Sequence, residues 1–241
     1  MHAHTVDVWC WDLDRPEGEL AGLRPLLSQD EQDRAARFVF ERDSNRYIAG
    51  RAILRRILGR YLAREAAGLR FCYNEFGKPR LADASSLHFN LSHAGGVAAL
   101  AISDRHEIGI DAEEKKPLKE DIARRFFSAA EYGALRGLSG QDYVEAFFRC
   151  WTRKEAFVKA HGAGLSLDLA SFDVSLLEGE APRLLRLGDD ATASAQWRLA
   201  NVHVRPHLAG ALAAFTGGAE IVLRYCDLHD MAESYPEIAG P

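Results

Sequence analysis

The spacing of apolar residues alternates between two periods along this chain, and the alternation limits the folds it can adopt. A strand-like opening, TVDVWCW, is followed by helical spacing in residues 28–62 and by short apolar runs typical of strands in residues 69–113. Helical spacing returns in residues 118–161, and strand-like runs fill residues 172–227. Because helices and strands are grouped into successive blocks, the pattern predicts an α+β fold with two similar halves.

A weak internal repeat supports the two halves. The segment HAGGVAALAISDRHEIGID, which starts at His93, resembles HLAGALAAFTGGAEIVLRY, which starts at His207. The two segments share the histidine, a glycine three residues later and an Ala-rich strand. We therefore expect an N-terminal α+β subdomain over residues 1–115 and a C-terminal α+β subdomain over residues 116–241. Chance similarity between two Ala-rich strands is the alternative interpretation.

Two capping-box patterns mark expected helix starts. Ser28 is followed three residues later by Glu31, and Ser128 is followed in the same way by Glu131. In such a box the serine side chain accepts a hydrogen bond from the first helical turn while the glutamate side chain reaches back to the serine N–H. The second pattern lies within a helix that we expect over residues 118–137.

The composition excludes several classes of protein. The chain has 241 residues, 47% of them hydrophobic, and a formal net charge of -5, which is ordinary for a globular protein. No run approaches the ~18 to 20 apolar residues of a membrane helix, so we expect no membrane partner and a cytoplasmic location. The 4 cysteines show no C-x-x-C spacing, which argues against a zinc ribbon and against a disulfide framework. We also expect the protein to be a monomer.

Basic residues are distributed unevenly along the chain. Residues 31–64 contain nine arginines against four acids, Glu31, Asp33, Glu41 and Asp43, which is a local excess of five positive charges in an acidic protein. Such an excess favours a site for an anion, and a solvated helix face is the alternative. Nucleic-acid binding would need an extended basic stripe, whereas this excess is local, so we expect no nucleic-acid partner.

Two acids lie two residues apart on an expected strand. In the run IGIDAEE, Asp111 and Glu113 project from the same face because successive side chains of a strand alternate. Their carboxylates can therefore converge on one cation, and Mg²⁺ is the hard cation that proteins hold with one or two carboxylates plus substrate phosphates. An exposed strand end leading into the charged turn EEKKP is the alternative. The second copy of the repeat lacks both acids, which predicts one metal site per chain.

Another acid and base lie on a helix that we expect over residues 142–161, ended by the glycine at position 162. Trp151, Glu155 and Lys159 follow one another at intervals of four residues, so they form one stripe along this helix. The stripe displays a carboxylate and an ammonium group beside an aromatic ring. An ordinary exposed ion pair between Glu155 and Lys159 is the alternative.

Groups suited to binding a phosphate lie in two further segments. FNLSHAGG joins a strand to a glycine turn with Asn90, Ser92 and His93 at its end, and NEFGKPR places Lys78 and Arg80 in a tight turn. A structural histidine whose hydrogen bonds are satisfied within the fold is the alternative for the first segment. Combined with the three acids and the helix lysine, these groups indicate a site for a metal ion and phosphate.

Five motifs of this chain, in their order, resemble those of one enzyme family. NEFGKP, FNLSHAGG, IGIDAEE, FFSAAEY and WTRKEAFVKAHGAGL resemble the surfactin-synthetase-activating (Sfp) type of 4′-phosphopantetheinyl transferase over about residues 34–175. The resemblance implies Mg²⁺-dependent transfer of 4′-phosphopantetheine from coenzyme A to a serine of apo acyl or peptidyl carrier domains, which belong to fatty acid, polyketide or nonribosomal peptide synthases. Adenosine 3′,5′-bisphosphate would be released. It also implies two α+β subdomains related by a pseudo-twofold axis, with coenzyme A bound between them.

The resemblance implies roles for individual residues. Asp111, Glu113 and Glu155 would hold Mg²⁺, and Glu155 would also be the general base for the carrier serine. Lys159 would contact a phosphate, so Asp111, Glu155 and Lys159 are the expected catalytic residues. These same three residues are also expected to contact coenzyme A, together with Arg34, Arg46, Lys78, Pro79, Arg80, Asn90, Ser92 and His93.

Two positions depart from the family pattern. Ala112, between the two strand acids, is smaller than the isoleucine common in relatives, so either water or another side chain could fill that face of the expected metal site. Glu31 stands where some relatives are basic, which bears on the role expected of Arg34.

Other functions share the same chemistry at the site. A Mg²⁺-dependent phosphoesterase or nuclease could use the same three acids, and a non-catalytic coenzyme-A-binding module could use the same phosphate contacts. For the family function, we expect the region 118–137, with Phe126, Phe127, Arg124 and Arg125, to contribute to docking of the carrier protein.

Overall fold

The computed structural model describes residues 4–83, 86–118, 122–162, 164–188 and 192–229. Strand β1 (His4–Asp12) is followed by helices α1 (Glu17–Leu23), α2 (Gln29–Ala35) and α3 (Glu41–Leu62), the hairpin strands β2 (Phe71–Tyr73) and β3 (Pro79–Leu81), and strands β4 (His88–Ala94) and β5 (Val97–Ser103). Strand β6 (Ile108–Glu114) leads into helices α4 (Ile122–Phe126), α5 (Ala129–Arg136) and α6 (Gly140–His161). The last strands are β7 (Phe172–Val174), β8 (Leu184–Leu187), β9 (Trp197–Asn201), β10 (Leu208–Phe215) and β11 (Ile221–Cys226).

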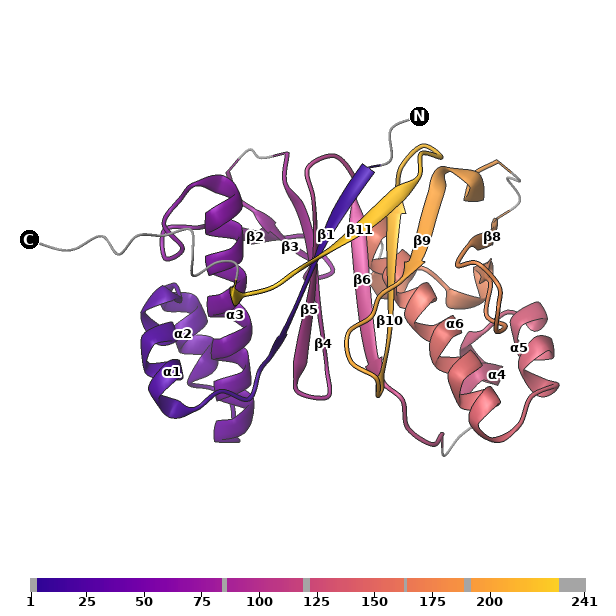
Figure 1. Ribbon diagram of the computed structural model, residues 1–241, viewed down its shortest axis with the longest axis horizontal. Helices are drawn as coiled ribbons and strands as arrows, with labels where there is room; N and C mark the ends of the chain where they lie inside the picture. Colours follow the sequence, from indigo (N-terminus) through magenta and orange to yellow (C-terminus); the bar gives the residue numbers. More distant parts are fainter. Residues whose placement is uncertain (1–3, 84–85, 119–121, 163, 189–191, 230–241) are drawn as a thin grey trace, which may run out of the picture.

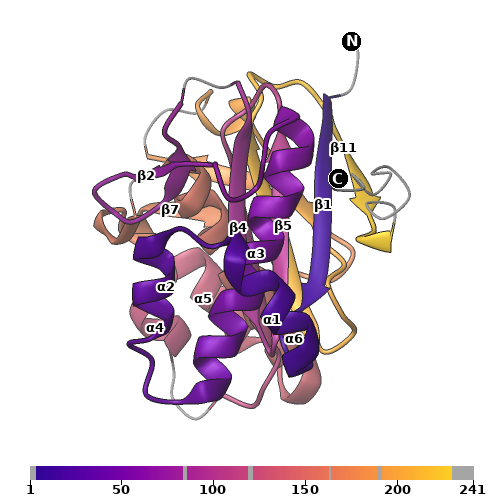
Figure 2. The same cartoon turned by 90° about the vertical axis from the view of Figure 1, so that its left-hand side faces the viewer.

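Helices and sheets are stacked in four layers (Figure 1). One sheet has the order β11-β1-β5-β4, and α1, α2 and α3 cover its outer face, as the turned view in Figure 2 also shows. The other sheet has the order β6-β10-β9, and its outer face packs on α4, α5 and α6. Strand β11 runs parallel to β1, whereas β5 runs antiparallel to its two neighbours, β1 and β4. In the other sheet β10 runs antiparallel to both β6 and β9. The expected α+β fold is confirmed.

Three hydrophobic cores separate these layers, and the middle core joins the two sheets. Strand β5 is buried along its whole length and turns alternate side chains towards different cores. Leu100 and Ile102 face the helices α1–α3, whereas Val97 and Ala99 face the second sheet. Burial of apolar surface contributes about 25 cal/mol per Å². Each half therefore depends on the other to cover one face of its sheet.

Strands β6 and β11 cross between the two halves of the chain. Strand β6 pairs with β10, while β11 returns to pair with β1 in the other sheet. Ile108, Ile110 and Ala112 of β6 enter the middle core, so the alternation of the strand turns Asp111 and Glu113 to the opposite face, towards α6. The expected division between residues 1–115 and 116–241 consequently does not follow the division between the sheets.

Each half contains a buried ion pair between a short helix and a long one. Both expected capping boxes are present, and both of their glutamates are buried. Glu31 pairs with Arg55 of α3 at 2.6 Å, and Glu131 pairs with Lys154 of α6 at 2.8 Å. Each cation also donates hydrogen bonds to main-chain carbonyl groups beyond its helix. Removing one partner of such a pair would leave a buried charge unpaired, which costs about 3 to 5 kcal/mol.

Local differences from the expected elements have identifiable causes. The helix expected over residues 118–137 is divided into α4 and α5, because Ser128 adopts an extended backbone (φ -65°, ψ 163°) as the N-cap of α5. The same capping box that starts α5 therefore ends α4; residues 119–121 of the expected helix lie outside the described residues. Helix α6 ends at Gly162 as expected, with a left-handed backbone. None of the described helices is long and apolar enough to cross a membrane.

Strand β6 and helix α6 touch at the level of the backbone. Gly109 of β6 lies against the second half of α6, and a methyl group on it would overlap the backbone oxygen of Ala156 and lie 2.9 Å from the carbonyl carbon of Lys159. Real Cβ atoms do not tolerate such contacts with backbone. Only glycine therefore lets α6 pack this closely on the strand that carries Asp111 and Glu113.

We expect Gly109→Ala to lower the free energy of unfolding by about 3 kcal/mol, because α6 must move away from β6 to accommodate the added methyl group. The measurement is urea unfolding followed by circular dichroism. Gly133→Ala is the matched control, because Gly133 is exposed on α5 with nothing near its missing side chain; it should raise stability by up to about 1 kcal/mol. Equal stability of Gly109→Ala and wild type would contradict the close contact.

Candidate active site

Strands β4 and β6 are linked by side chains where the two sheets meet. The Asn90 side-chain oxygen accepts a hydrogen bond from the Ile110 N–H at 2.9 Å, and the Ser92 hydroxyl accepts one from the Ala112 N–H at 3.3 Å. Both side chains of β4 are buried. In this structure Asn90 and Ser92 therefore hold the strand of the acids in place, and neither lines the cavities described below.

Asp111 is a buried carboxylate with one engaged and one unpartnered oxygen. Its Oδ1 accepts hydrogen bonds from Lys159 Nζ at 2.6 Å and from the Ser92 hydroxyl at 3.1 Å. Its Oδ2 is buried and has no hydrogen-bond partner among the described residues. Burial raises the pKa of Asp111 above its usual value, although the Lys159 ammonium acts in the opposite direction. An unpartnered oxygen on a buried carboxylate is costly unless another group binds it.

Glu113 and Glu155 extend this acid cluster. Burial raises the pKa of both carboxyl groups, and the nearby charge of Asp111 raises each further. Trp151 donates a hydrogen bond to Glu113, so the aromatic member of the α6 stripe orients one of the acids. The three acids named from the sequence thus lie close enough for the charge of Asp111 to disfavour ionisation of both glutamates.

The acid cluster contains the ligand atoms that a hard cation prefers, but its side chains are not positioned to hold one. Carboxylate oxygens are the ligands that Mg²⁺ prefers, and three like charges beside a buried, unpartnered oxygen favour a bound cation. Among the described residues, however, no group of three or more His, Cys, Asp or Glu side chains is arranged to hold a metal ion. Lys159, rather than a further acid, occupies Asp111 Oδ1.

A cavity of about 470 Å³ receives part of the arginine-rich segment and is lined by His93, the residue that follows Ser92 in β4. Four of the residues expected to bind the coenzyme line it: Arg34, Arg46, Pro79 and His93. Solvent reaches part of the His93 ring, yet the surrounding protein atoms, with the charges of Lys159 and Arg51, lower the pKa of His93 to about 4. A neutral imidazole at neutral pH offers one N–H donor to an anion in this cavity.

Arg46 is held at the wall of this cavity by an aspartate that the sequence motifs do not single out. Asp14 accepts hydrogen bonds from Arg46 Nε and Nη2, both at 2.7 Å. The turn at Gly96 (φ +80°) lies directly against this pair, and a methyl group there would approach Asp14 Oδ2 to 2.9 Å. Asp14 and Arg46 are 32 residues apart, so no local spacing could have linked them.

A second cavity, of about 410 Å³, adjoins the first at β3. Lys78 and Arg80 line it, and Pro79 lines both cavities. Lys78 Nζ lies 3.2 Å from Glu107 Oε2 and donates to the Ile108 carbonyl oxygen at 3.1 Å. The residues expected to bind phosphate therefore divide between two adjacent cavities.

Two arginines of the basic segment serve the fold. Arg51 and Arg55 both bind the buried Glu31 carboxylate, and their guanidinium groups lie over the Phe71 ring at 4.6 and 5.1 Å. Glu31, which departs from the family pattern, thus neutralises neighbouring arginines inside the N-terminal half. Arg34 lies over the Tyr47 ring at 5.3 Å and remains at the cavity.

Comparison with known proteins identifies the family. The 4′-phosphopantetheinyl transferase HetI of Nostoc sp. is 42% identical over 184 residues, which cover 74% of this chain and 77% of that protein. The chain belongs to the 4′-phosphopantetheinyl transferase superfamily. The sequence pattern of this superfamily matches residues 107–215, and the pattern of the family named 4′-phosphopantetheinyl transferase, N-terminal, matches residues 14–105. The two matched regions meet just before β6, in agreement with the pairing of β6 in the second sheet.

Other phosphopantetheinyl transferases match a similar share of the chain. The transferase Sfp of Bacillus subtilis is 36% identical over 166 residues, covering 68% of this chain and 74% of that protein. Among solved structures, the holo-[acyl-carrier-protein] synthase of Thermotoga maritima covers 46% of this chain and 63% of its own, at 22% identity and a TM-score of 0.38. The Sfp-type resemblance inferred from the motifs is confirmed by the sequence relatives.

Proposed function

We propose that this chain transfers the 4′-phosphopantetheine group of coenzyme A to a serine of apo acyl or peptidyl carrier domains, with Mg²⁺ as cofactor. The observation that carries the proposal is an acid cluster on β6 and α6 whose Lys159 also acts on His93 of a basic cavity, in a chain of the phosphopantetheinyl transferase superfamily. The cluster supplies negative charge for a cation, and the cavity supplies positive charge for phosphate groups. A reaction at a diphosphate needs both.

Each charged group has a role in this proposal. Asp111, Glu113 and Glu155 would hold Mg²⁺, which, when bound, neutralises charge on the coenzyme diphosphate. Glu155 takes the proton of the carrier serine as the serine oxygen bonds to the β-phosphorus and the bond to the leaving adenosine 3′,5′-bisphosphate breaks. Lys159 stabilises the negative charge that this bisphosphate carries away.

The two cavities would hold the coenzyme. Arg34, Arg46 and His93 are proposed to contact its phosphate groups from the larger cavity, because their side chains line it. Lys78, Pro79 and Arg80 are proposed to contact it along β3, since Pro79 belongs to both cavities. Asn90 and Ser92 position the acids indirectly, because they accept hydrogen bonds from the backbone of β6.

The deciding experiment incubates an apo carrier protein with coenzyme A, Mg²⁺ and the enzyme and measures the intact mass of the carrier. We expect the mass to rise by one phosphopantetheine group. Glu155→Gln and Asp111→Ala should each reduce the initial rate at least about 10²-fold, because each removes a charge from the reacting centre. Wild-type rates in either variant would contradict the assignment of the acids.

Controls in the same assay separate the other two functions. Consumption of coenzyme A without a carrier would indicate a phosphoesterase, and coenzyme binding without transfer across several carriers would indicate a binding module. Either result would overturn the proposal. Glu113→Gln tests the third acid separately.

The surface of α4 is proposed to dock the carrier protein. Arg124 and Arg125 are exposed there, and the Arg125 guanidinium lies 5.1 Å from the centre of the Phe126 ring. Phe126 in turn packs edge-on against Trp151, with ring centres 5.9 Å apart, and Trp151 is hydrogen-bonded to Glu113. A carrier bound at α4 would therefore lie next to the acid cluster. Positive charge suits carrier domains, which are usually acidic.

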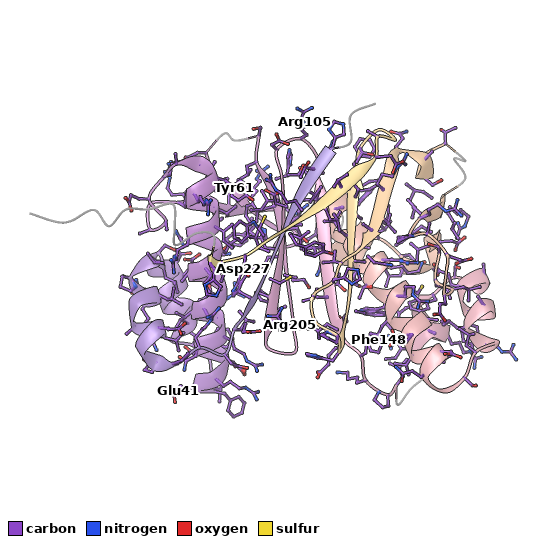
Figure 3. All side chains as sticks on the ribbon, viewed as in Figure 1. Glu41, Tyr61, Arg105, Phe148, Arg205 and Asp227 are labelled. Carbon is purple, nitrogen blue, oxygen red and sulfur yellow. The ribbon has the colours of Figure 1, made fainter. Side chains whose placement is uncertain are left out.

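We expect the double variant Arg124→Glu and Arg125→Glu to raise the KM for the carrier roughly tenfold while the KM for coenzyme A stays unchanged, because reversed charge repels only the acidic partner. Steady-state kinetics with each substrate varied in turn provides the measurement. Arg105→Glu is a matched control, since Figure 3 shows Arg105 at the end of the sheets away from α4. Unchanged carrier KM in the double variant would exclude this docking surface.

A further inference from the structure

Lys159 makes three contacts at the strand that carries the acids. Its Nζ lies 2.6 Å from Asp111 Oδ1, donates to the Ser92 hydroxyl at 3.1 Å and donates to the Ile110 carbonyl oxygen at 3.3 Å. The Asp111 side chain is 4% exposed and that of Lys159 is 29% exposed. The ion pair is therefore closed on the aspartate side and open to solvent on the lysine side.

One ammonium group serves all three acids. The charge of Lys159 lowers the pKa of Asp111, Glu113 and Glu155, whereas burial raises all three and the charge of Asp111 raises those of the two glutamates. Among the described residues no group of three or more His, Cys, Asp or Glu side chains is arranged to hold a metal ion, and Asp111 is paired with Lys159. Lys159 thus supplies positive charge to all three acids.

We propose that Lys159 is the internal counter-cation of the acid cluster and competes with a divalent cation for Asp111. This inference rests on the proposed function. When the coenzyme diphosphate arrives, the ammonium group gains a new anionic partner and can leave Asp111 Oδ1 by rotating its flexible side chain. Asp111 Oδ1 then becomes available to the cation, together with the unpartnered Oδ2.

The competition has a thermodynamic consequence. A ligand that draws Lys159 away from Asp111 makes cation binding more favourable, and by linkage the cation makes that ligand bind more tightly by the same factor. Divalent cation and coenzyme A should therefore bind cooperatively, and the cooperativity should depend on the charge at position 159. A site in which Lys159 only contacts phosphate would show no tighter cation binding when the lysine is neutralised in the absence of coenzyme.

The test measures Mn²⁺ binding to the full-length protein, from the electron paramagnetic resonance signal of free Mn²⁺, with and without coenzyme A and with no carrier present. In the absence of coenzyme, Lys159→Gln should bind Mn²⁺ at least roughly fivefold more tightly than wild type, and Lys159→Arg should resemble wild type because it keeps the charge. Coenzyme A should tighten Mn²⁺ binding to wild type more than to Lys159→Gln.

Lys116→Gln controls for the general loss of a positive charge. The charge of Lys116 also reaches Glu113, but its side chain is exposed and is not an Asp111 ligand, so its neutralisation should change Mn²⁺ affinity about twofold or less. Equal effects of Lys116→Gln and Lys159→Gln, or unchanged affinity in Lys159→Gln, would overturn the competition.

Thermal unfolding provides a second readout. Without Lys159, the buried Asp111 lacks its ion-pair partner, so Mn²⁺ should raise the Tm of Lys159→Gln more than that of wild type. A Lys159→Gln protein that folds only with Mn²⁺ would also support the inference, whereas a smaller Tm rise than in wild type would contradict it. These coenzyme-free measurements stand apart from the proposed function, which fails if the wild-type protein modifies no carrier.

Discussion

The contact between Gly109 and the backbone of α6 is the constraint on which the candidate site depends. It sets the distance between the strand that carries Asp111 and Glu113 and the helix that carries Glu155 and Lys159. A larger residue would separate these elements, and the ion pair between Asp111 and Lys159 could not keep its 2.6 Å length. A residue without a side chain thus determines where four charged side chains meet.

Buried carboxylates are fully paired in the core of each half but only partly paired at the site. Glu31 and Glu131 each have buried cationic partners and accept several hydrogen bonds, so the charge of each carboxylate is balanced within the protein. At the site, three acids share mainly Lys159, and one Asp111 oxygen has no partner among the described residues. Helix α6 contributes to both arrangements through adjacent residues, Lys154 and Glu155, which lie on different faces. The protein therefore concentrates unbalanced negative charge at one place where a ligand can balance it.

Features that depend on local spacing could be predicted from the sequence. The alternation of a strand placed Asp111 and Glu113 on one face, and the capping boxes at Ser28 and Ser128 fixed two helix starts. Contacts between distant segments could not be predicted, because no local period relates Asp14 to Arg46 across 32 residues or Asn90 to Ile110 across 20. The family resemblance named the three acids and Lys159 but not the ion pair between Lys159 and Asp111.

The position of β6 in the second sheet explains why the site draws on both halves of the chain. Ser92 comes from the sheet of the N-terminal half, whereas Asp111 and Lys159 belong to the sheet and helix of the other half. The strand carrying the acids is held by β10 on one edge and by side chains of β4 on the other. Any movement between the two sheets would alter the hydrogen bonds of Ser92 to Asp111 and Lys159. A ligand that binds across this junction can therefore shift the competition between Lys159 and a cation for Asp111. It needs no unfolding to do so, because the groups that must move are side chains located between the two sheets.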